Sequence, residues 1–379
     1  MEGDPRIGLV LDDRYQIAER LAAGGMGVVY RAERVGLGKS VAVKFLHRTS
    51  AMMPQHRVRF EREAEAMSRL THPNLVSIID YGSHDDLPYL IMEYHPGSSL
   101  RAVLDREGQL APARAVFIAR QMLAGLASAH RSGVVHRDLK PANVLLCGAP
   151  GEDLVKILDF GVAKLLDGGG GPTEVSVVAG HVMGTPSYMS PEHARAQPID
   201  GRSDVYSVGV MLFEMVTGRR PFEAAGKLGI LRKQVEEPPA SPRQAVPELS
   251  EELDAAILRA MEKDRDRRFA SAADFAAALA AVPEGRAGRQ LEGDRGGRGR
   301  HESPTPTPTP TPAEAPAAVE PAEVWTRPAR RTRVGRAVLI GLFISVILWG
   351  GLWGAVELGL VDIPVPWLNR VPWADLDLS

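Results

Sequence analysis

Apolar and polar positions alternate along much of residues 15–93, which predicts a β-rich segment. Strands are expected at residues 15–21, 28–32, 40–46, 75–81 and 89–93. Within the third of these strands, Lys44 shares its face with the apolar Ala42 and Leu46. A helix is expected over residues 54–70, and its apolar stripe also carries Glu63. A lysine on an apolar face either reaches water or pairs with an anion, so Glu63 is the expected partner of Lys44.

Helical periodicity dominates the part of the chain that follows. Helices are expected at residues 113–131, 204–215, 251–261 and 271–281, and short strands at 143–146 and 155–158. The His95-Pro96-Gly97 triplet interrupts the pattern and is predicted to be a hinge between a small β-rich lobe and a helical lobe. The helix at 204–215 is apolar nearly all round and should be buried. Asp204 at its start suits an N-cap.

The composition changes after residue 282. Residues 283–336 are rich in Gly, Arg, Pro and Ala, cannot bury enough apolar surface to fold, and are expected to form an extended linker. Residues 337–356 carry no charge and have the length that a helix needs to cross a bilayer. Five arginines precede this segment: Arg327, Arg330, Arg331, Arg333 and Arg336. The positive-inside rule then places the N-terminal domain in the cytoplasm and residues 357–379 outside it.

The overall composition of the 379-residue chain excludes several classes of protein. The net charge of −2 shows no basic excess, so no nucleic-acid partner is expected. Cys147 is the single cysteine, which excludes an intrachain disulfide, and it is expected to be a small buried residue. Residues 1–14 contain early acidic residues and no apolar core, so they do not predict a signal peptide.

Three short segments carry candidate chemistry. Glycines Gly24, Gly25 and Gly27 lie between two predicted strands, where they form either a plain hairpin turn or a backbone cradle for phosphate. The cradle is not a Walker A loop, because no Gly-Lys-Ser/Thr follows and the next element is a strand. Residues 135–143 read VHRDLKPAN and form either a solvated turn or a site. An Asp-Phe-Gly triplet begins at Asp159.

Eight motifs occur in the order and spacing that resemble a protein kinase catalytic domain over residues 15–282. They read GGMGVVY, VAVK, FEREAE, HPNLV, HRDLKPAN, DFG, GTPSYMSPE and DVYSVG. The chain most resembles the bacterial membrane-anchored serine/threonine kinases of the eukaryotic-like, or Hanks, type. The resemblance implies an α+β fold of the bilobal protein kinase type, with a small β-rich N-lobe and a large helical C-lobe. A disordered linker and one transmembrane helix would follow.

The resemblance also implies that ATP binds at the β-rich lobe. The residues expected to contact ATP are Leu21, Gly24, Gly25, Gly27, Val29, Ala42, Lys44, Met92, Glu93 and Tyr94. Lys44, oriented by Glu63, would hold the α- and β-phosphates. Asn143 and Asp159 would hold Mg²⁺ or Mn²⁺, hard cations that prefer oxygen ligands.

Roles in the transfer itself are implied for the polar loop. Asp138 would accept the proton of the substrate hydroxyl or orient that hydroxyl, and Lys140 would neutralise the γ-phosphate in transit. Lys140 and Thr185 accompany serine/threonine specificity in the family. His136 is interpreted as a structural residue that packs the loop against the helical lobe.

Three further residues are implied to have structural roles. Glu192 and Arg268 resemble the buried ion pair of the helical lobe of the family. Asp204 would brace the backbone of the catalytic loop from the buried helix, an alternative to its N-cap interpretation.

The chain departs from the family pattern at two places. Ala22 replaces the first glycine of the glycine-rich loop, and a modest effect on nucleotide affinity is expected. Residues 177–179 replace the activating threonines of relatives, so Thr173 and Ser176 are the candidate autophosphorylation sites.

The sequence predicts a single-pass protein of the cell membrane with a cytoplasmic kinase domain. Its expected partners are ATP, proteins that carry Ser or Thr, the bilayer, and a second copy through glycines of the span. Three alternatives remain: a pseudokinase that serves as a membrane-tethered scaffold, a small-molecule kinase of similar fold, and a plain membrane anchor.

Overall fold

The structure is a computed structural model of the whole chain. It describes residues 4–24, 27–46, 64, 68–148, 152–159, 177–178, 181–182 and 185–286. The chain divides into two units, Met1–Ser303 and Pro304–Ser379, and every described residue belongs to the first. No helix in the described ranges combines the length and the apolar character that a membrane crossing requires. The predicted span at 337–356 lies outside these ranges.

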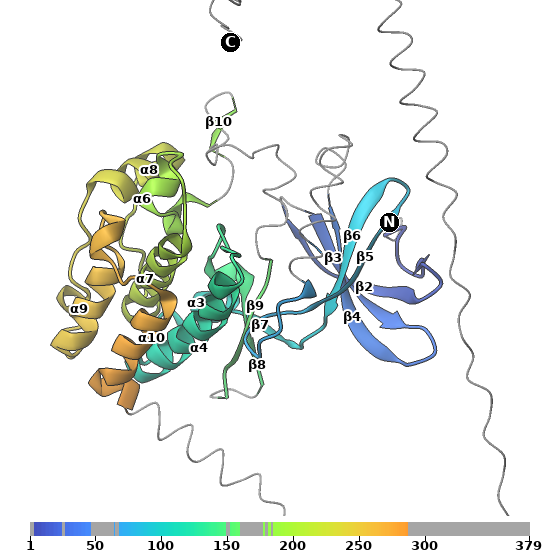
Figure 1. Cartoon of the computed structure of the whole chain (residues 1–379), viewed down its shortest axis with the longest axis horizontal. Helices are drawn as coiled ribbons and strands as arrows, with labels where there is room; N and C mark the ends of the chain where they lie inside the picture. The colour runs from blue at the N-terminus through green and yellow to red at the C-terminus, as the bar shows by residue number, and fades with distance from the viewer. Residues whose placement is uncertain are drawn as a thin grey trace, which may run out of the picture. The chain divides into compact units, whose positions relative to one another are not determined.

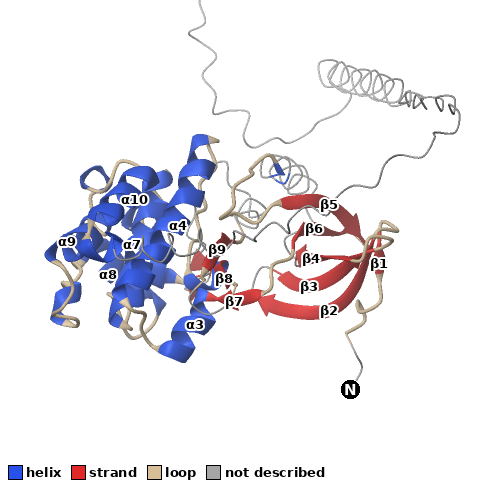
Figure 2. Ribbon diagram, turned by 90° about the horizontal axis from the view of Figure 1, so that it is seen from below, coloured by secondary structure: helices blue, strands red, loops and turns tan. Residues whose placement is uncertain are grey.

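Six antiparallel strands form the sheet of the N-terminal lobe. This sheet is drawn on the right in Figures 1 and 2. Their order across the sheet is β1-β2-β3-β4-β6-β5. The strands are β1 (Val10–Leu11), β2 (Tyr15–Gly24), β3 (Gly27–Arg34), β4 (Lys39–Leu46), β5 (Ile78–His84) and β6 (Leu87–Glu93). The predicted hairpin is thus present as β2 and β3, and both strands extend beyond the expected bounds.

The alternation of side chains in β4 gives this sheet two different apolar faces. On one face Phe45 packs between Tyr30 and Tyr89, with ring centroids 5.8 and 5.7 Å away. A second apolar cluster includes Ala64, which belongs to the predicted helix over 54–70. Lys44 is buried on the second face, as the pattern of β4 predicts, and therefore needs a polar partner.

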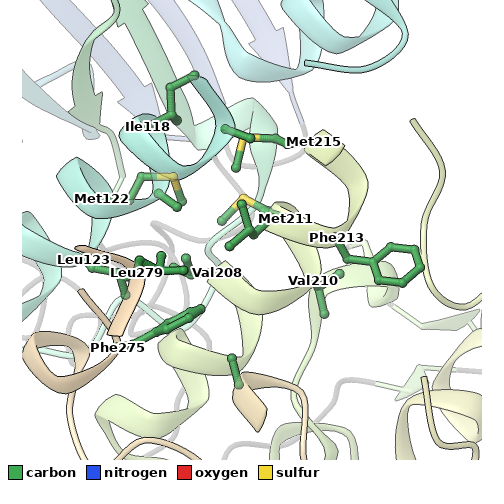
Figure 3. Close-up of a cluster of buried hydrophobic side chains, with 14 of the residues drawn as sticks. Ile118, Met122, Leu123, Val208, Val210, Met211, Phe213, Met215, Phe275 and Leu279 are labelled. Carbon is green, nitrogen blue, oxygen red and sulfur yellow. The ribbon is translucent and has the colours of Figure 1, made fainter. Parts of the chain in front are cut away.

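Helices make up most of the C-terminal lobe. They are α3 (Leu100–Glu107), α4 (Pro112–Arg131), α6 (Pro191–Ala194), α7 (Gly201–Thr217), α8 (Lys227–Glu236), α9 (Glu251–Ala260) and α10 (Ala272–Ala281). Every residue of α7 from 203 to 217 is buried, as expected for a helix that is apolar nearly all round. Figure 3 shows Val208 and Met211 of α7 in one cluster with Met122 of α4 and Phe275 of α10. A polar side chain on this helix must find a hydrogen-bond partner inside the protein.

A small antiparallel sheet lies between the helices and the N-terminal lobe (Figure 2). Its strands are β7 (Gly97–Ser99), β8 (Val144–Cys147) and β9 (Leu154–Ile157). The backbone N–H of Val76 donates to Ile157 O at 3.1 Å, and the N–H of Ile157 donates to Asn74 O at 2.9 Å. The chain that leads into β5 is thereby joined to β9. Cys147 is buried, as predicted.

Two predicted boundaries were wrong, one because of a tertiary contact and the other because of a local helix cap. The strand expected at 75–81 begins only at Ile78, since Leu75 pairs with Ile157 of the small sheet. The helix expected at 204–215 begins at Gly201, and its N-cap is Asp200, whose carboxylate accepts a hydrogen bond from Arg202 N at 2.9 Å. The N-cap interpretation of Asp204 is therefore wrong.

Most other predicted elements are displaced by only one or a few residues. The short strands and the helices expected at 113–131, 251–261 and 271–281 correspond to β8, β9, α4, α9 and α10. Helices α3 and α8 were not predicted. The start of α3 does have a local signal, because the Ser99 side chain accepts a hydrogen bond from Ala102 N as an N-cap.

Candidate active site

The loop over residues 135–143 is attached to the buried helix α7 by Asp204. The Asp204 carboxylate is 1% exposed and accepts hydrogen bonds from the backbone N–H of His136 at 2.9 Å and of Arg137 at 3.2 Å. Its Oδ2 also lies 2.8 Å from His130 Nε2. Arg137 has a φ of 68°, in the left-handed region that costs a non-glycine residue about 1–2 kcal/mol. The bonds to Asp204 offset this cost and hold the loop in place.

His136 is fully buried and connects the loop to the end of β9. Its Nε2 lies 2.8 Å from the carbonyl oxygen of Leu158, and its Nδ1 lies 3.3 Å from the backbone N of Asp138. A carbonyl can only accept and a backbone N–H can only donate, so Nε2 carries the proton and Nδ1 accepts. Both ring nitrogens are thus engaged, which leaves His136 a structural role and no role as a base.

Asp138, Lys140 and Asn143 converge within the same loop. Lys140 Nζ lies 2.8 Å from Asp138 Oδ2, and Asn143 Nδ2 donates to the Asp138 carbonyl oxygen at 2.9 Å. The backbone N–H of Leu158 donates to Asn143 O at 2.9 Å. These bonds place an acid, an amine and an amide beside the segment that leads to Asp159. The Asp138 side chain remains 12% exposed, so it can meet a substrate hydroxyl.

Lys44 and Asp159 join the two lobes through an ion pair. Lys44 Nζ lies 2.8 Å from Asp159 Oδ2, and the lysine side chain is only 7% exposed. The pair satisfies the charge that β4 buries on its second face. Asp159 has a φ of 53°, so the chain turns sharply directly after β9. The predicted partner Glu63 lies outside the described residues.

The residues expected to contact the nucleotide lie on neighbouring strands of the large sheet. Val29 of β3 lies directly opposite Lys44 of β4, and Ala42 of β4 lies directly opposite Met92 of β6. Residues opposite each other in an antiparallel pair share one face of the sheet. The second face of the sheet therefore presents an apolar surface with one buried amine, which suits a flat base followed by phosphates. Leu21 belongs to β2 and is exposed.

The glycine-rich hairpin approaches β4 closely at Gly27. Gly27 has a φ of 152°, and a Cβ atom placed there would lie 1.9 Å from the carbonyl oxygen of Phe45. Any side chain at this position would displace the backbone. A Cβ atom placed on Gly24 would have no described atom within 4 Å, so the close approach is confined to the Gly27 side of the hairpin. Gly25 lies outside the described residues.

The hinge between the lobes carries a charged cluster that the sequence pattern did not reveal. Glu93 ends β6, and its Oε2 lies 3.2 Å from His95 Nε2 and 3.9 Å from Lys156 Nζ. Burial acts to raise the pKa of Glu93, but the His95 hydrogen bond and the charge of Lys156 lower it below the ordinary range. Tyr94 follows Glu93 and is half-buried. Lys156 alternates with apolar residues in β9, and that alternation is the one available sequence signal.

A pocket opens at the catalytic loop. It is lined by residues from the loop, from the segment after residue 184 and from α7, among them Asp138, Lys140, Thr185, Tyr188 and Ser207. Thr185 is exposed and directly precedes the short 3-10 helix η2 (Pro186–Tyr188). The structure therefore brings the threonine expected to accompany serine/threonine specificity to the same pocket as the two charged groups of the loop.

Glu192 and Arg268 form a buried, doubly hydrogen-bonded ion pair in the helical lobe. Arg268 Nη1 and Nη2 donate to the two carboxylate oxygens of Glu192 at 2.8 and 2.7 Å. Ser203 also donates its hydroxyl to this carboxylate. Burial acts to raise the pKa of Glu192, but Arg268 and Ser203 lower it to about 2. The pair fastens the start of α6 to the segment before α10.

The donor set fits a divalent cation that binds together with a phosphate substrate. Among the described residues no group of three or more His, Cys, Asp or Glu side chains could hold a metal. Asp159 and Asn143 offer one carboxylate and one amide at the same end of β9. Mg²⁺ is usually held by one or two carboxylates, with phosphate oxygens and water as its other ligands. The predicted phosphorylation sites Thr173 and Ser176 lie outside the described residues.

Comparison with known proteins gives one consistent result. The family described as "Protein kinase domain" matches residues 15–279. The serine/threonine-protein kinase pkn3 of Myxococcus xanthus is 42% identical over 288 residues, which cover 75% of this chain and 52% of that protein. The serine/threonine-protein kinase PknB of Mycolicibacterium smegmatis is 39% identical over 282 residues, 73% of this chain and 44% of that protein. The chain thus spans about half the length of these relatives.

A solved structure has the same fold. The crystal structure of the PknI kinase domain of Mycobacterium tuberculosis, determined for a double mutant, matches with a TM-score of 0.59 at 26% sequence identity. The match covers 74% of this chain and 98% of the PknI chain.

Proposed function

Because this chain belongs to the bacterial Hanks-type serine/threonine protein kinases, we propose that it transfers the γ-phosphate of ATP to serine and threonine hydroxyls of proteins. The observation that carries the proposal is that Lys44, Asp159, Asp138 and Lys140 converge where the lobes meet. These residues form two ion pairs, Lys44 with Asp159 and Asp138 with Lys140. Hydrogen bonds through His136 and Leu158 connect the two pairs.

The reaction asks the protein chiefly for positioning and charge neutralisation. The substrate hydroxyl would lie at Asp138, whose carboxylate accepts the proton as the oxygen–phosphorus bond forms. Lys140 already contacts Asp138 and would neutralise the charge on the transferring phosphoryl group. ADP leaves with the electron pair of the broken bond.

The nucleotide would lie against the second face of the large sheet. Val29, Ala42 and Met92 would contact the base, and Lys44 would hold the α- and β-phosphates. A divalent cation at Asn143 and Asp159 would neutralise phosphate charge. The hairpin at Gly24 and Gly27 and the hinge at Glu93 and Tyr94 would close the site on its other sides.

A labelled-ATP transfer assay tests this proposal. The full-length chain, with Mg²⁺ and a generic basic protein, should label both itself and that protein. The Asp138→Asn variant should be nearly inactive. An inert wild-type protein would refute the proposed activity and favour the pseudokinase scaffold, which gains no support from the described residues. Equal activity in the variant would refute the role proposed for Asp138.

A second part of the proposal concerns the membrane. Residues 337–356 would cross the cell membrane once and leave the kinase domain in the cytoplasm. Glycines of the span would permit close approach of a second copy. Protease added to intact cells should shorten the chain at residues 357–379 only. Recovery of the chain in the aqueous fraction without detergent would refute the span.

Activation by autophosphorylation is proposed at Thr173 and Ser176. A phosphate there needs a nearby cation, and Arg137 of the catalytic loop is the expected donor. Mass spectrometry of an active preparation tests this, because an unmodified activation segment would refute it.

A further inference from the structure

Gln234 of α8 has a buried side-chain amide in which every polar atom is engaged. The residue is 0% exposed. Its Nε2 donates to Ser187 O at 2.6 Å and to Pro186 O at 3.2 Å, and its Oε1 accepts a hydrogen bond from Tyr206 OH. A side-chain amide offers two N–H donors and a carbonyl oxygen that can accept twice, so this arrangement uses both donors and one of the two acceptor positions. Because both donors bind carbonyl oxygens of one short segment, the amide fixes the conformation of that segment.

That segment is η2, which borders the pocket of the catalytic loop. Thr185 directly precedes η2 and lines the pocket with Asp138 and Lys140. Both carbonyls that Gln234 binds are therefore within two residues of Thr185. The distance between this backbone segment and α8 therefore sets the position of Thr185 relative to the catalytic loop.

Helix α7 and the chain after it hold the same segment at other points. Ser207 donates to Tyr188 O at 2.8 Å, and Glu214 accepts from the Tyr188 hydroxyl at 2.6 Å. Arg220 donates to the Ser187 hydroxyl at 3.0 Å. None of these bonds reaches the carbonyls of residues 186 and 187. Within the described part of the chain, Gln234 is the side chain that binds these two carbonyls, and the backbone N–H of Met189 also donates to Pro186 O at 3.2 Å.

The main chain of Gln234 is fixed as well. Lys263 Nζ donates to Gln234 O at 2.8 Å and lies 4.1 Å from the centroid of the Phe222 ring. Tyr206, which donates to the Gln234 amide, is itself 0% exposed on the buried helix α7. Both the backbone and the side chain of Gln234 are thus held by hydrogen bonds, so the glutamine can hold η2 in a fixed position.

We propose that Gln234 is a positioning residue for the acceptor protein: its amide sets Pro186 and Ser187 so that Thr185 and the adjoining pocket receive the segment that carries the acceptor hydroxyl. This inference rests on the proposed protein kinase function. The hydrogen-bond partners of Gln234 are Tyr206, Pro186, Ser187 and Lys263, and none of these is among the residues proposed to hold ATP or to take part in the transfer. Loss of Gln234 should therefore weaken binding of the acceptor and leave binding of ATP unchanged.

Two variants of the full-length chain test the proposal. Gln234→Glu keeps the size and the acceptor but removes the two amide donors, so a carboxyl group faces two carbonyl oxygens. Gln234→Met keeps the approximate shape and removes all polar atoms. In both variants the KM for a serine-containing acceptor peptide should rise about tenfold, the change expected for one lost set of hydrogen bonds. The KM for ATP should stay within twofold of the wild-type value.

Ser250→Ala supplies the matched control. Ser250 caps α9, accepts a hydrogen bond from Leu253 N and donates to Glu284, without contact to η2. This variant should lower the melting temperature and leave both KM values unchanged. A merely structural role for Gln234 would give the same pattern as Ser250→Ala, and that result in either glutamine variant overturns the inference. A wild-type chain that phosphorylates no peptide would instead overturn the proposed function.

Discussion

Lys44 Nζ lies 2.8 Å from Asp159 Oδ2, and this contact joins strand β4 of the N-terminal lobe to the end of β9 in the small sheet. The lysine is buried on the apolar face that would receive the nucleotide. A buried amine beside a carboxylate can exchange that partner for phosphate oxygens when the nucleotide binds. The pair therefore defines the position at which substrate charge is expected.

Removal of the Lys44 amine should abolish most of the transfer activity. Lys44→Met should lower the rate of labelled-phosphate transfer on the order of a hundredfold or more, because a preorganised charge at the phosphates is lost. Lys39→Met is the matched control, since Lys39 lies on the same strand and is exposed. Equal loss of activity in both variants would contradict a specific role of Lys44.

The transfer activity should depend on the negative charge of Asp138. Asp138→Asn keeps the size of the side chain but cannot accept the hydroxyl proton, so kcat should fall by about 10²–10⁴. The fall should appear in kcat and leave the KM for ATP nearly unchanged, as initial rates will show. Asp86→Asn, at the exposed turn between β5 and β6, should retain wild-type activity. Unaltered kcat in Asp138→Asn would exclude this residue from proton transfer.

The buried ion pair of Glu192 and Arg268 should contribute strongly to stability. Glu192→Gln leaves the guanidinium of Arg268 buried without its charge partner, at a cost of about 3–5 kcal/mol. Chemical denaturation measures this cost. Glu236→Gln breaks an exposed pair with Arg232 and should cost less than about 1 kcal/mol. Similar costs for the two variants would show that burial adds nothing to the Glu192 pair.

The Glu192 carboxylate should also make the stability of the folded protein sensitive to acid. The pKa of Glu192 falls from its ordinary value of 4.5 to about 2 in the folded protein, because Arg268 outweighs the effect of burial. The resulting stability is fully present above pH 4.5 and is lost as the pH falls through 2, by roughly 3 kcal/mol. Glu192→Gln should lack this part of the pH dependence. Denaturation curves of the wild type and the variant at pH 2–6 provide the measurement. If stability changes with pH by the same amount in both proteins, the prediction is contradicted.

Because of Lys263, the stability of the folded protein should also depend on pH in the neutral to alkaline range. Burial lowers the pKa of its ammonium from the ordinary 10.5 to about 7, and the charge of Arg268 acts in the same direction. Between these two values the unfolded chain binds the proton that the folded protein has released, so stability rises with pH. Lys263→Met should remove this rise between pH 7 and 9.5, as denaturation midpoints will show. Lys227→Met, an exposed lysine of α8, should keep the wild-type profile.

Many features of the fold follow from local patterns. The alternation in β4 predicted which face buries Lys44, and the apolar character of α7 predicted its burial. The order of motifs indicated the family, because the reaction requires the same residue types at the same spacing. The motifs also named Asp138, Lys140 and Asn143, which the structure brings together in one loop.

Other features depend on contacts between residues far apart in the chain, which periodicity does not encode. Asp204 lies one turn inside its helix and bonds to the loop at His136, because Asp200 already caps the helix. Gln234 looks like an ordinary polar residue of an amphipathic helix, yet packing buries it against η2. The sequence by itself determined most of the elements and the residue types of the reacting groups. Only the tertiary structure decided their partners, since a buried polar group bonds to whatever folding brings within reach.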